Sequence, residues 1–204
     1  MVTVYETLER PLIPVLTQME NNGIKVDPLI LRQMSEDFSK RLEDRAAEIY
    51  SISGSDFNIG SPKQLGEVLF DKLGLAGGKK NKTGAYGTGV EVLEELAANG
   101  SELAVKIIEW RQISKLKSTY TDALIQEINP ATGRIHTSYS MTGANTGRLS
   151  SNSPNLQNIP IRTDEGRKIR TAFIAESGNT LLSIDYSQIE LRLLADIANI
   201  QSLK

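Results

Sequence analysis

One run of helical spacing constrains the fold of this chain more than any other feature. Between residues 28 and 52, apolar side chains recur at helical intervals with charged residues between them: Leu31, Met34, Phe38, Leu42 and Ile49. Asp27 and Pro28 precede this run and supply an N-cap and a proline at the first helical position. The pattern predicts one long amphipathic helix over residues 28–52.

The rest of the first half is also predicted to be helical. Gly23 supplies a stop for a helix near the N-terminus, and Ser61–Pro62 repeats the cap signature at the start of a third helix. Helical patterns resume over residues 90–100 and, after a serine cap, over residues 102–127. Between them lies AGGKKNKTGAYGTG (76–89), with five glycines and three lysines, which predicts an exposed, mobile loop. This loop is either a flexible connector or a basic tip that contacts a polyanion.

The sequence changes character at residue 129. Turn-forming residues and polar loops now separate short β-branched segments, which are predicted as strands at 134–140, 171–175 and 180–185, before a final helix. Helices followed by strands and helices indicate an α+β fold. We therefore expect a helical subdomain over residues 1–128 and the start of a sheet subdomain over residues 129–204.

Composition excludes several classes of protein and of site. Of the 204 residues 39% are apolar, enough for a packed core, and the absence of cysteine excludes disulfides, thiolate nucleophiles and cysteine-ligated metals. No apolar run has the length of a membrane span, and the N-terminus lacks the pattern of a signal peptide. We expect a cytoplasmic protein.

Charge is unevenly distributed along the chain. The net charge is −2, yet residues 106–170 carry ten Lys or Arg against five Asp or Glu. A basic middle suggests an anionic partner, usually nucleic acid, although solvated helix faces also collect lysines. Arg111 and Lys115 share one helix face, and Ser118 and Thr119 add hydroxyl groups suited to phosphate oxygens.

The stretch LLSIDYSQIELRLL (181–194) carries one charge that folding alone does not explain. Ser187 and Glu190 match a capping box at the start of the final helix, which accounts for both residues. Asp185 closes an apolar strand, where a carboxylate is costly unless it meets solvent, donors or a cation. Mg²⁺ prefers one or two carboxylates with water and phosphate oxygens, so Asp185 is either a turn residue or a metal ligand.

Seven blocks of the sequence carry a resemblance to a known family. DYSQIELR resembles the first catalytic motif of the family A DNA polymerases, the bacterial DNA polymerase I type. The other blocks, all in the family's order, are NNGIKVDP (21–28), FNIGSPKQL (57–65), KLKSTYTD (115–122), TGRLSS (146–151), PNLQNIP (154–160) and EGRKIR with AFIA (165–175). The resemblance implies a helical polymerase thumb with long antiparallel helices in residues 1–128, with an N-terminal segment associated with the palm. Residues 129–204 would form the first part of the palm, with a small, mostly antiparallel sheet.

The resemblance also implies roles for residues in the palm part. Asp185 is similar to the aspartate that bridges two Mg²⁺ ions, and the carbonyl of Tyr186 would be a further ligand. Glu190 resembles the steric gate that favours deoxynucleotides. Arg148 resembles the arginine that reaches the minor groove at the primer end, and Gln157 and Asn158 lie in a block similar to the loop that lines template and primer.

In the thumb part the resemblance implies contacts to the DNA backbone that are independent of sequence and weakened by salt. The matching positions are Asn58, Ser61, Arg111, Lys115, Lys117, Ser118 and Thr119. Ser61 is equally well explained as the cap of the third helix. Arg162, Arg167 and Arg170 would face either DNA phosphates or solvent, whereas His136 is most simply structural and Trp110 most simply part of a core.

The resemblance stops where the chain ends. The family's fingers helix and its second carboxylate motif have no counterpart in this sequence, so we expect part of a template-directed DNA polymerase that is inactive alone. Such an enzyme transfers nucleotides from dNTPs to a primer 3′-hydroxyl in replication and repair, in association with the nucleoid, so its partners would be primer–template DNA and dNTPs. The alternative is a non-catalytic duplex-DNA-binding module.

Overall fold

The computed structural model describes residues 2–80 and 84–203, apart from the side chain of residue 203. The chain divides into two compact units, Met1–Ile174 and Ala175–Lys204, and each is described by itself. Short antiparallel strands accompany many helices in the first unit, which confirms the predicted α+β fold.

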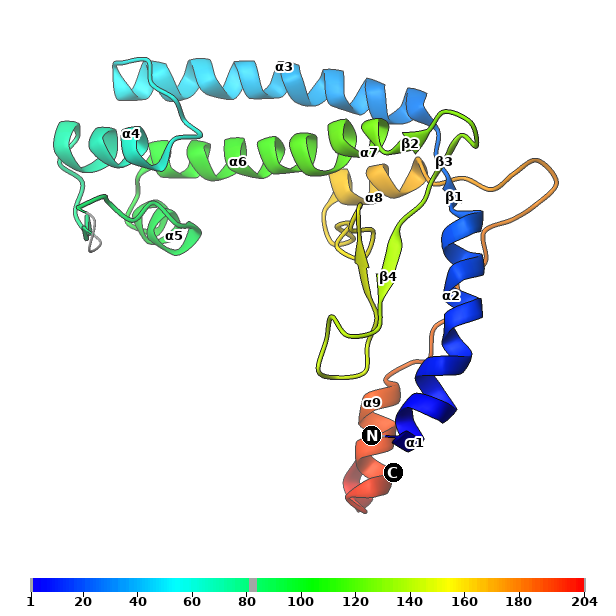
Figure 1. Cartoon of the computed structure of the whole chain (residues 1–204). Helices are drawn as coiled ribbons and strands as arrows, with labels where there is room; N and C mark the ends of the chain where they lie inside the picture. The colour runs from blue at the N-terminus through cyan, green and yellow to red at the C-terminus, as the bar shows by residue number, and fades with distance from the viewer. Residues whose placement is uncertain (1, 81–83, 204) are drawn as a thin grey trace. The chain divides into compact units, whose positions relative to one another are not determined.

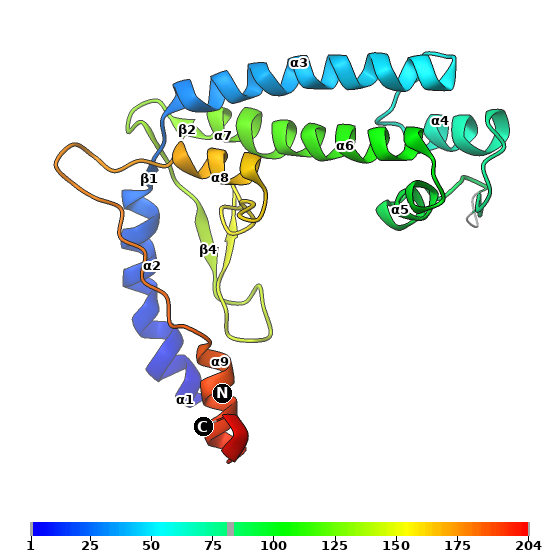
Figure 2. The same ribbon diagram turned by 180° about the vertical axis from the view of Figure 1, so that it is seen from behind.

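Two long antiparallel rows of helix lie side by side and dominate the first unit (Figures 1 and 2). One row is α3 (Pro28–Ser53), which confirms the helix predicted over residues 28–52. Asp27 caps it by accepting a hydrogen bond from the Leu29 amide at 2.8 Å. The second row runs through α6 (Glu102–Leu116), the π-helical turn η3 (Lys117–Thr121) and α7 (Asp122–Gln126), and α6 packs along α3.

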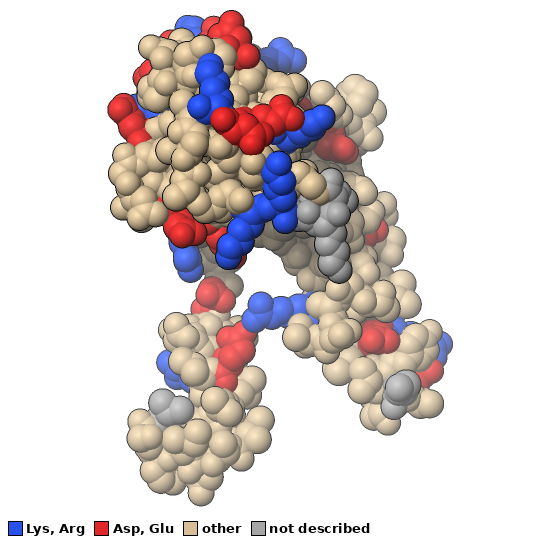
Figure 3. All heavy atoms as spheres, turned by 90° about the vertical axis from the view of Figure 1, so that its left-hand side faces the viewer, with Lys and Arg blue, Asp and Glu red and all other residues tan. Residues whose placement is uncertain are grey.

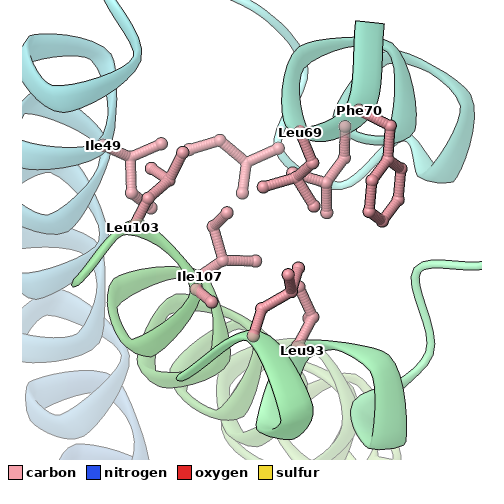
Figure 4. Close-up of a cluster of buried hydrophobic side chains, with 10 residues drawn as sticks. Ile49, Leu69, Phe70, Leu93, Leu103 and Ile107 are labelled. Atoms are coloured by element: carbon pink, nitrogen blue, oxygen red, sulfur yellow. The ribbon is translucent and has the colours of Figure 1, made fainter. Parts of the chain in front are cut away.

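Smaller helices close one end of these two rows. They are α4 (Pro62–Gly66), the π-helical turn η2 (Glu67–Lys72) and α5 (Val90–Ala98). Their apolar faces meet those of α3 and α6 in a buried cluster (Figure 4) that comprises Ile49, Ile59, Leu65, Leu69, Phe70, Leu93, Leu96, Leu103, Ala104 and Ile107. Trp110 is partly buried against this cluster, in agreement with a structural role.

An N-terminal helical segment leads into the first strand. It comprises α1 (Val2–Val4), η1 (Tyr5–Glu9) and α2 (Arg10–Asn22), and it ends at Gly23 as predicted. Gly23 has a positive φ of 58°, and a Cβ there would lie 2.6 Å from the Ile135 carbonyl oxygen. Only glycine therefore fits at this point without strain.

Two small antiparallel sheets follow. The first has the order β1-β3-β2, formed by Ile24–Lys25, Arg134–Ile135 and Ile128–Asn129, and the second pairs β4 (Ser138–Ser140) with β5 (Ser150–Asn152). The last helix of the unit is α8 (Asp164–Thr171). A second buried cluster joins the first sheet and α8 to α3, η3 and α7; it comprises Val26, Leu31, Tyr120, Leu124, Ile135, Ile159, Ile169 and Ala172.

Two predicted strands are wrong. In segment 171–175 only Phe173 forms an isolated bridge, to Val26, while the Ile174 amide donates to the Lys25 carbonyl at 3.0 Å. Segment 180–185 forms no strand, and Leu182 and Ile184 are each 81% exposed. A strand requires a neighbour that satisfies its backbone groups, and among the described residues none pairs with this segment.

The second unit contains α9 (Ile189–Ile197) and the short turn η4 (Gln201–Leu203). The predicted capping box is wrong, because the N-cap is Gln188, with φ 53° and no side-chain cap bond. The helix thus begins one residue later than a Ser187 cap requires, which moves Glu190 out of the capping register. Among the described residues, no helix combines the length and apolar character needed to span a membrane.

Candidate nucleic-acid interface

A groove of about 570 Å³ runs beside α6, and we call it the α6 groove. Three segments of the first unit line it: the turn before α4, the residues before α5, and one face of α6 with η3. The lining residues are Gly60, Pro62, Thr88, Gly89, Trp110, Arg111, Ser114, Lys115 and Ser118. The structure therefore brings Arg111, Lys115 and Ser118 together beside the turn that contains Asn58 and Ser61.

Arg111 serves two purposes in this groove. Its guanidinium donates to the Thr88 carbonyl oxygen through Nη1 and to the Thr88 hydroxyl through Nη2 at 3.3 Å. Burial lowers the pKa of Arg111, but an arginine starts so far above neutral pH that it stays charged. Arg111 thus fastens the segment before α5 to α6 and leaves a positive charge in the groove.

Lys115 lies one helical turn after Arg111 and is exposed. Ser118 follows on the same side and donates its hydroxyl to the Ser114 carbonyl at 2.8 Å, so its oxygen remains an acceptor in the groove. Thr119 is also exposed. These placements leave Lys115 as the exposed cation of the groove's α6 wall.

Lys117 pairs with a carboxylate, and its contact with the DNA backbone stays a prediction. Its ammonium nitrogen lies 2.6 Å from Asp122 Oδ2, and the other oxygen of Asp122 accepts from the Ser35 hydroxyl at 2.5 Å. Burial alone would raise the pKa of Asp122, but the hydrogen bonds from Lys117 and Ser35 outweigh it and lower the pKa below its usual value. This network ties α7 to α3.

Replacing Asp122 by Asn tests this network. A carboxyl group whose pKa is lowered by folding stabilises the protein above its unfolded pKa of about 3.9 and loses that contribution as pH falls through the lower folded pKa. Because the Asp122 side chain is 38% exposed, we expect a cost of about 1 kcal/mol or less at pH 7. Urea unfolding should show this difference from the wild-type chain shrinking below pH 4, whereas Asp56→Asn, at an exposed position, should change little at either pH.

The turn before α4 is organised by its own side chains. Asn58 Oδ1 accepts from the backbone amide of Gly60 at 2.9 Å, and the backbone amide of Asn58 donates to Gln64 Oε1 at 2.7 Å. Ser61 is the N-cap of α4 and accepts from the Gln64 amide at 3.5 Å, which confirms its predicted capping role. A contact of either side chain with phosphate stays a prediction.

The glycine-rich loop lies partly within the described residues. Lys80 pairs with Tyr86 in an isolated bridge, and its ammonium lies 4.6 Å from the centroid of the Tyr86 ring. Lys79 is exposed, whereas Lys82 lies outside the described residues. Figure 3 shows basic side chains interspersed with acidic ones on this side of the molecule. Both interpretations of the loop, connector and basic tip, therefore stay predictions.

A larger cavity of about 830 Å³ lies between α3, α6 and the loop before α8. Two of its three cations are paired with carboxylates: Arg41 with Glu165 at 3.0 Å, and Arg45 with Glu109 at 2.9 Å. The third, Lys115, also lines the α6 groove. These pairs neutralise much of the positive charge that a polyanion would need. The α6 groove is accordingly the better candidate for binding nucleic acid.

The block around Arg148 is held by hydrogen bonds. Arg148 is exposed in the connection between β4 and β5. The Gln157 amide group bonds to the Leu149 carbonyl at 2.9 Å and to the Ser151 amide at 3.2 Å. The Asn158 carbonyl accepts from the Tyr120 hydroxyl, which joins this block to η3.

Other basic residues have structural partners. Arg170 donates to the carbonyls of Ile159 and Pro160, at 2.8 and 3.1 Å, and Arg167 lies 2.5 Å from Asp164. Both ring nitrogens of His136 are hydrogen-bonded, Nδ1 to the Glu20 carbonyl and Nε2 to the Thr132 hydroxyl, each at 2.8 Å, as expected of a structural histidine. Arg162 is exposed.

The remaining candidates lie in the second unit. Asp185 is exposed in an irregular segment, Tyr186 is 79% exposed, and Glu190 lies in the first turn of α9. Within the described residues, no three His, Cys, Asp or Glu side chains form a group that could hold a metal ion. Asp185 and the Tyr186 carbonyl offer hard oxygen donors of the kind that Mg²⁺ accepts.

Sequence reasoning missed two contacts. Thr88, the partner of Arg111, lies in a segment interpreted as loop, and Tyr120, the partner of the Asn158 carbonyl, lies in a helix. In both cases a side chain bonds to a backbone carbonyl far away in the sequence, and no local pattern indicates such a pair.

Comparison with known proteins identifies the family. The family model for DNA polymerase family A matches residues 29–204. DNA polymerase I of Rhizobium leguminosarum is 60% identical over 206 residues, covering 100% of this chain and 20% of the relative. DNA polymerase I of Pseudomonas aeruginosa is 53% identical over 195 residues, covering 96% of this chain and 21% of the relative.

A solved structure agrees with these matches. It is described as the POL domain of Pol1 from M. smegmatis in complex with DNA primer-template and dNTP, and it superposes with a TM-score of 0.87 at 40% identity. The match covers 98% of this chain and 35% of that chain, and the chain spans about a fifth of the length of the two relatives above. The chain belongs to DNA polymerase family A.

Proposed function

We propose that this chain is part of a template-directed DNA polymerase and that its α6 groove holds the primer–template duplex. The observation that carries the proposal is the convergence of Arg111, Lys115 and Ser118 with the turn before α4 in one groove. The similar Pol1 domain was solved with primer-template and dNTP, which supports the same partners for this chain.

We assign the thumb to residues 1–128 and the first part of the palm to residues 129–204. The pairing of Ile24 with Ile135 supports an N-terminal segment associated with the palm, because it places β1 in the same sheet as β3. The compact units divide elsewhere, after Ile174, so the assignment describes function and not packing. Along this thumb the α6 groove, with Thr119, Asn58 and Ser61 nearby, would contact phosphates without reading sequence.

Removing one groove cation tests duplex binding. Binding by the wild-type chain should be micromolar or weaker and should fall steeply with salt, because each neutralised phosphate releases counterions. Lys115→Gln should weaken binding and reduce the slope of log K against log salt concentration by about 0.9. Fluorescence anisotropy with a labelled duplex measures both quantities.

Lys40→Gln is the matched control, since Lys40 is exposed on α3 and does not line the groove. It should leave the slope nearly unchanged. Binding by the wild-type chain that does not respond to salt would contradict the proposed role of the groove.

In the palm part we assign Arg148 to the minor groove at the primer end. Minor-groove acceptors differ little between base pairs, so an arginine there can donate hydrogen bonds to any correctly paired primer end. Gln157 and Asn158 belong to the same block and would lie near the site of nucleotide insertion. Glu190, in the first turn of α9, would stand where a ribose 2′-hydroxyl falls and so favour dNTPs.

Asp185 and the Tyr186 carbonyl are the residues that would hold Mg²⁺. The donor set fits, because an exposed carboxylate beside a carbonyl leaves room for water and substrate phosphates. Two bound Mg²⁺ ions would supply charge stabilisation to the attacking 3′-hydroxyl and the leaving pyrophosphate. Since Asp185 is a single carboxylate and the described residues contain no larger cluster, we propose that the isolated chain does not polymerise DNA.

One observation favours the alternative of a non-catalytic duplex-binding module. The α6 groove lies wholly in the first unit and needs no residue of segment 175–204. The two functions differ in whether Asp185 is required for nucleotide transfer, which replacing Asp185 in a chimeric polymerase decides.

A further inference from the structure

The segment around Arg148 is built on two buried hydroxyl groups. Ser151 is 1% exposed and Thr137 is 6% exposed, and their side-chain oxygens lie 2.6 Å apart. The Ser151 oxygen also accepts from the Leu156 amide at 3.1 Å. These buried bonds fix β5 and the turn after it. Breaking them would be costly, because a buried hydroxyl group would lose its hydrogen-bond partner.

Gln157 holds the same segment through the backbone. Its Nε2 donates to the Leu149 carbonyl at 2.9 Å and its Oε1 accepts from the Ser151 amide at 3.2 Å, so the amide group bonds on both sides of Ser150. An amide has one acceptor and one donor side, and it therefore satisfies this pair of backbone groups as a neighbouring strand would. The backbone N–H of Gln157 donates to Asn155 Oδ1 at 2.9 Å, which fixes the main chain from which this side chain projects.

We propose that Gln157 is a positioning residue for Arg148: it clamps the backbone at 149–151 and so directs the segment that presents Arg148 to the primer end. The DNA part of this inference rests on the proposed function, whereas the clamp itself does not. A bidentate contact of a glutamine with a base edge needs the donor and acceptor that Gln157 already uses on the backbone. Gln157 therefore acts through Arg148 and not by touching a base.

Limited proteolysis tests the clamp without DNA. Gln157→Leu keeps a similar volume but removes both hydrogen bonds, so trypsin should cut after Arg148 several-fold faster relative to cleavage after Arg162. Hydrogen exchange of the Ser151 amide should rise in parallel. Gln157→Glu retains the acceptor for the Ser151 amide but not the donor to Leu149, and it should show an intermediate effect.

Gln33→Leu is the matched control, because Gln33 is exposed on α3. Trypsin should cleave this variant at the same rate as the wild-type chain. Unchanged cleavage and exchange in Gln157→Leu would overturn the clamp. A general rise at both arginines would also count against it, since it would indicate global unfolding.

DNA binding tests the action through Arg148. The probe is a primer–template whose terminal primer guanine either has or lacks the minor-groove N3 acceptor, the latter as 3-deazaguanine. The wild-type chain should bind the normal primer more tightly, and Arg148→Ala should abolish this preference. Gln157→Leu should reduce the preference, and the double variant should bind no more weakly than Arg148→Ala alone.

The two experiments separate two kinds of failure. A double variant that binds more weakly than Arg148→Ala would show that Gln157 contacts DNA itself and would overturn the positioning role. Equal affinity of the wild-type chain for the two primers would overturn the proposed role of Arg148, and with it the role of the clamp in DNA binding. In that case the proteolysis result would still decide whether the clamp exists.

Discussion

The isolated 204-residue chain is expected to leave a primer unextended when it is incubated with primer–template DNA, dNTPs and Mg²⁺. Nucleotidyl transfer by the two-metal mechanism requires both ions to be held against the reacting oxygens. Asp185 would supply one carboxylate, and within the described ranges no three ligating side chains form a group that could hold a metal ion. Electrophoresis of a labelled primer measures extension, and any product that depends on this chain would contradict the proposal.

The matching positive experiment places the chain in a complete enzyme. The corresponding segment of the Rhizobium leguminosarum polymerase, 60% identical to this chain, is replaced by residues 1–204. We expect this chimera to extend primers and Asp185→Asn to reduce extension below detection, because a neutral amide cannot replace an anionic metal ligand. Asp37→Asn, at an exposed position on α3, is the control and should remain active. Full activity of Asp185→Asn would favour the non-catalytic module.

Ile107→Ala should produce a large loss of stability. Ile107 is fully buried, and Figure 4 shows it among Leu93, Leu103 and Ile49, between the small helices and α3. The substitution removes the side-chain atoms beyond Cβ. Their lost transfer free energy and the cavity that they leave together cost about 2–5 kcal/mol. Urea denaturation should show a lower midpoint with an unchanged slope.

Val105→Ala provides the comparison on the same helix. Val105 is 40% exposed, so its truncation should change the free energy of unfolding by less than about 0.5 kcal/mol. Equal losses for the two variants would contradict the assignment of Ile107 to the core. Duplex binding should also weaken. The variant has a larger unfolded fraction, and unfolded chains lack the α6 groove that contains Arg111, one helical turn after Ile107.

Helix starts and stops were the most predictable part of the fold. Asp27, Ser61 and Ser101 each accept a hydrogen bond from a backbone amide two or three residues later. A capping bond joins near neighbours, so its signal is complete within a few residues of sequence. The spacing of Leu31, Phe38 and Ile49 likewise placed one face of α3 in the core.

Strands and caps near Asp185 were less predictable. Segment 180–185 has the apolar composition of a strand, but a strand exists only where another chain segment satisfies its backbone groups, and composition does not name that partner. The Ser187–Glu190 pattern failed for a related reason. A capping box also requires the helix to begin at the serine, and the left-handed backbone at Gln188 moves that start by one residue.

The sequence by itself determined the family, the long helices and the residues that we propose for contacts with DNA and Mg²⁺, because motif order, periodicity and caps are properties of neighbouring residues. Only the tertiary structure decided which of these residues share a surface. It placed Lys115 in the α6 groove, directed Lys117 to Asp122, and turned Arg111 and Gln157 towards backbone groups of other segments. The physical reason is that a cation or an amide bonds to whichever partner the fold brings within about 3 Å, and that partner can be far away in the sequence.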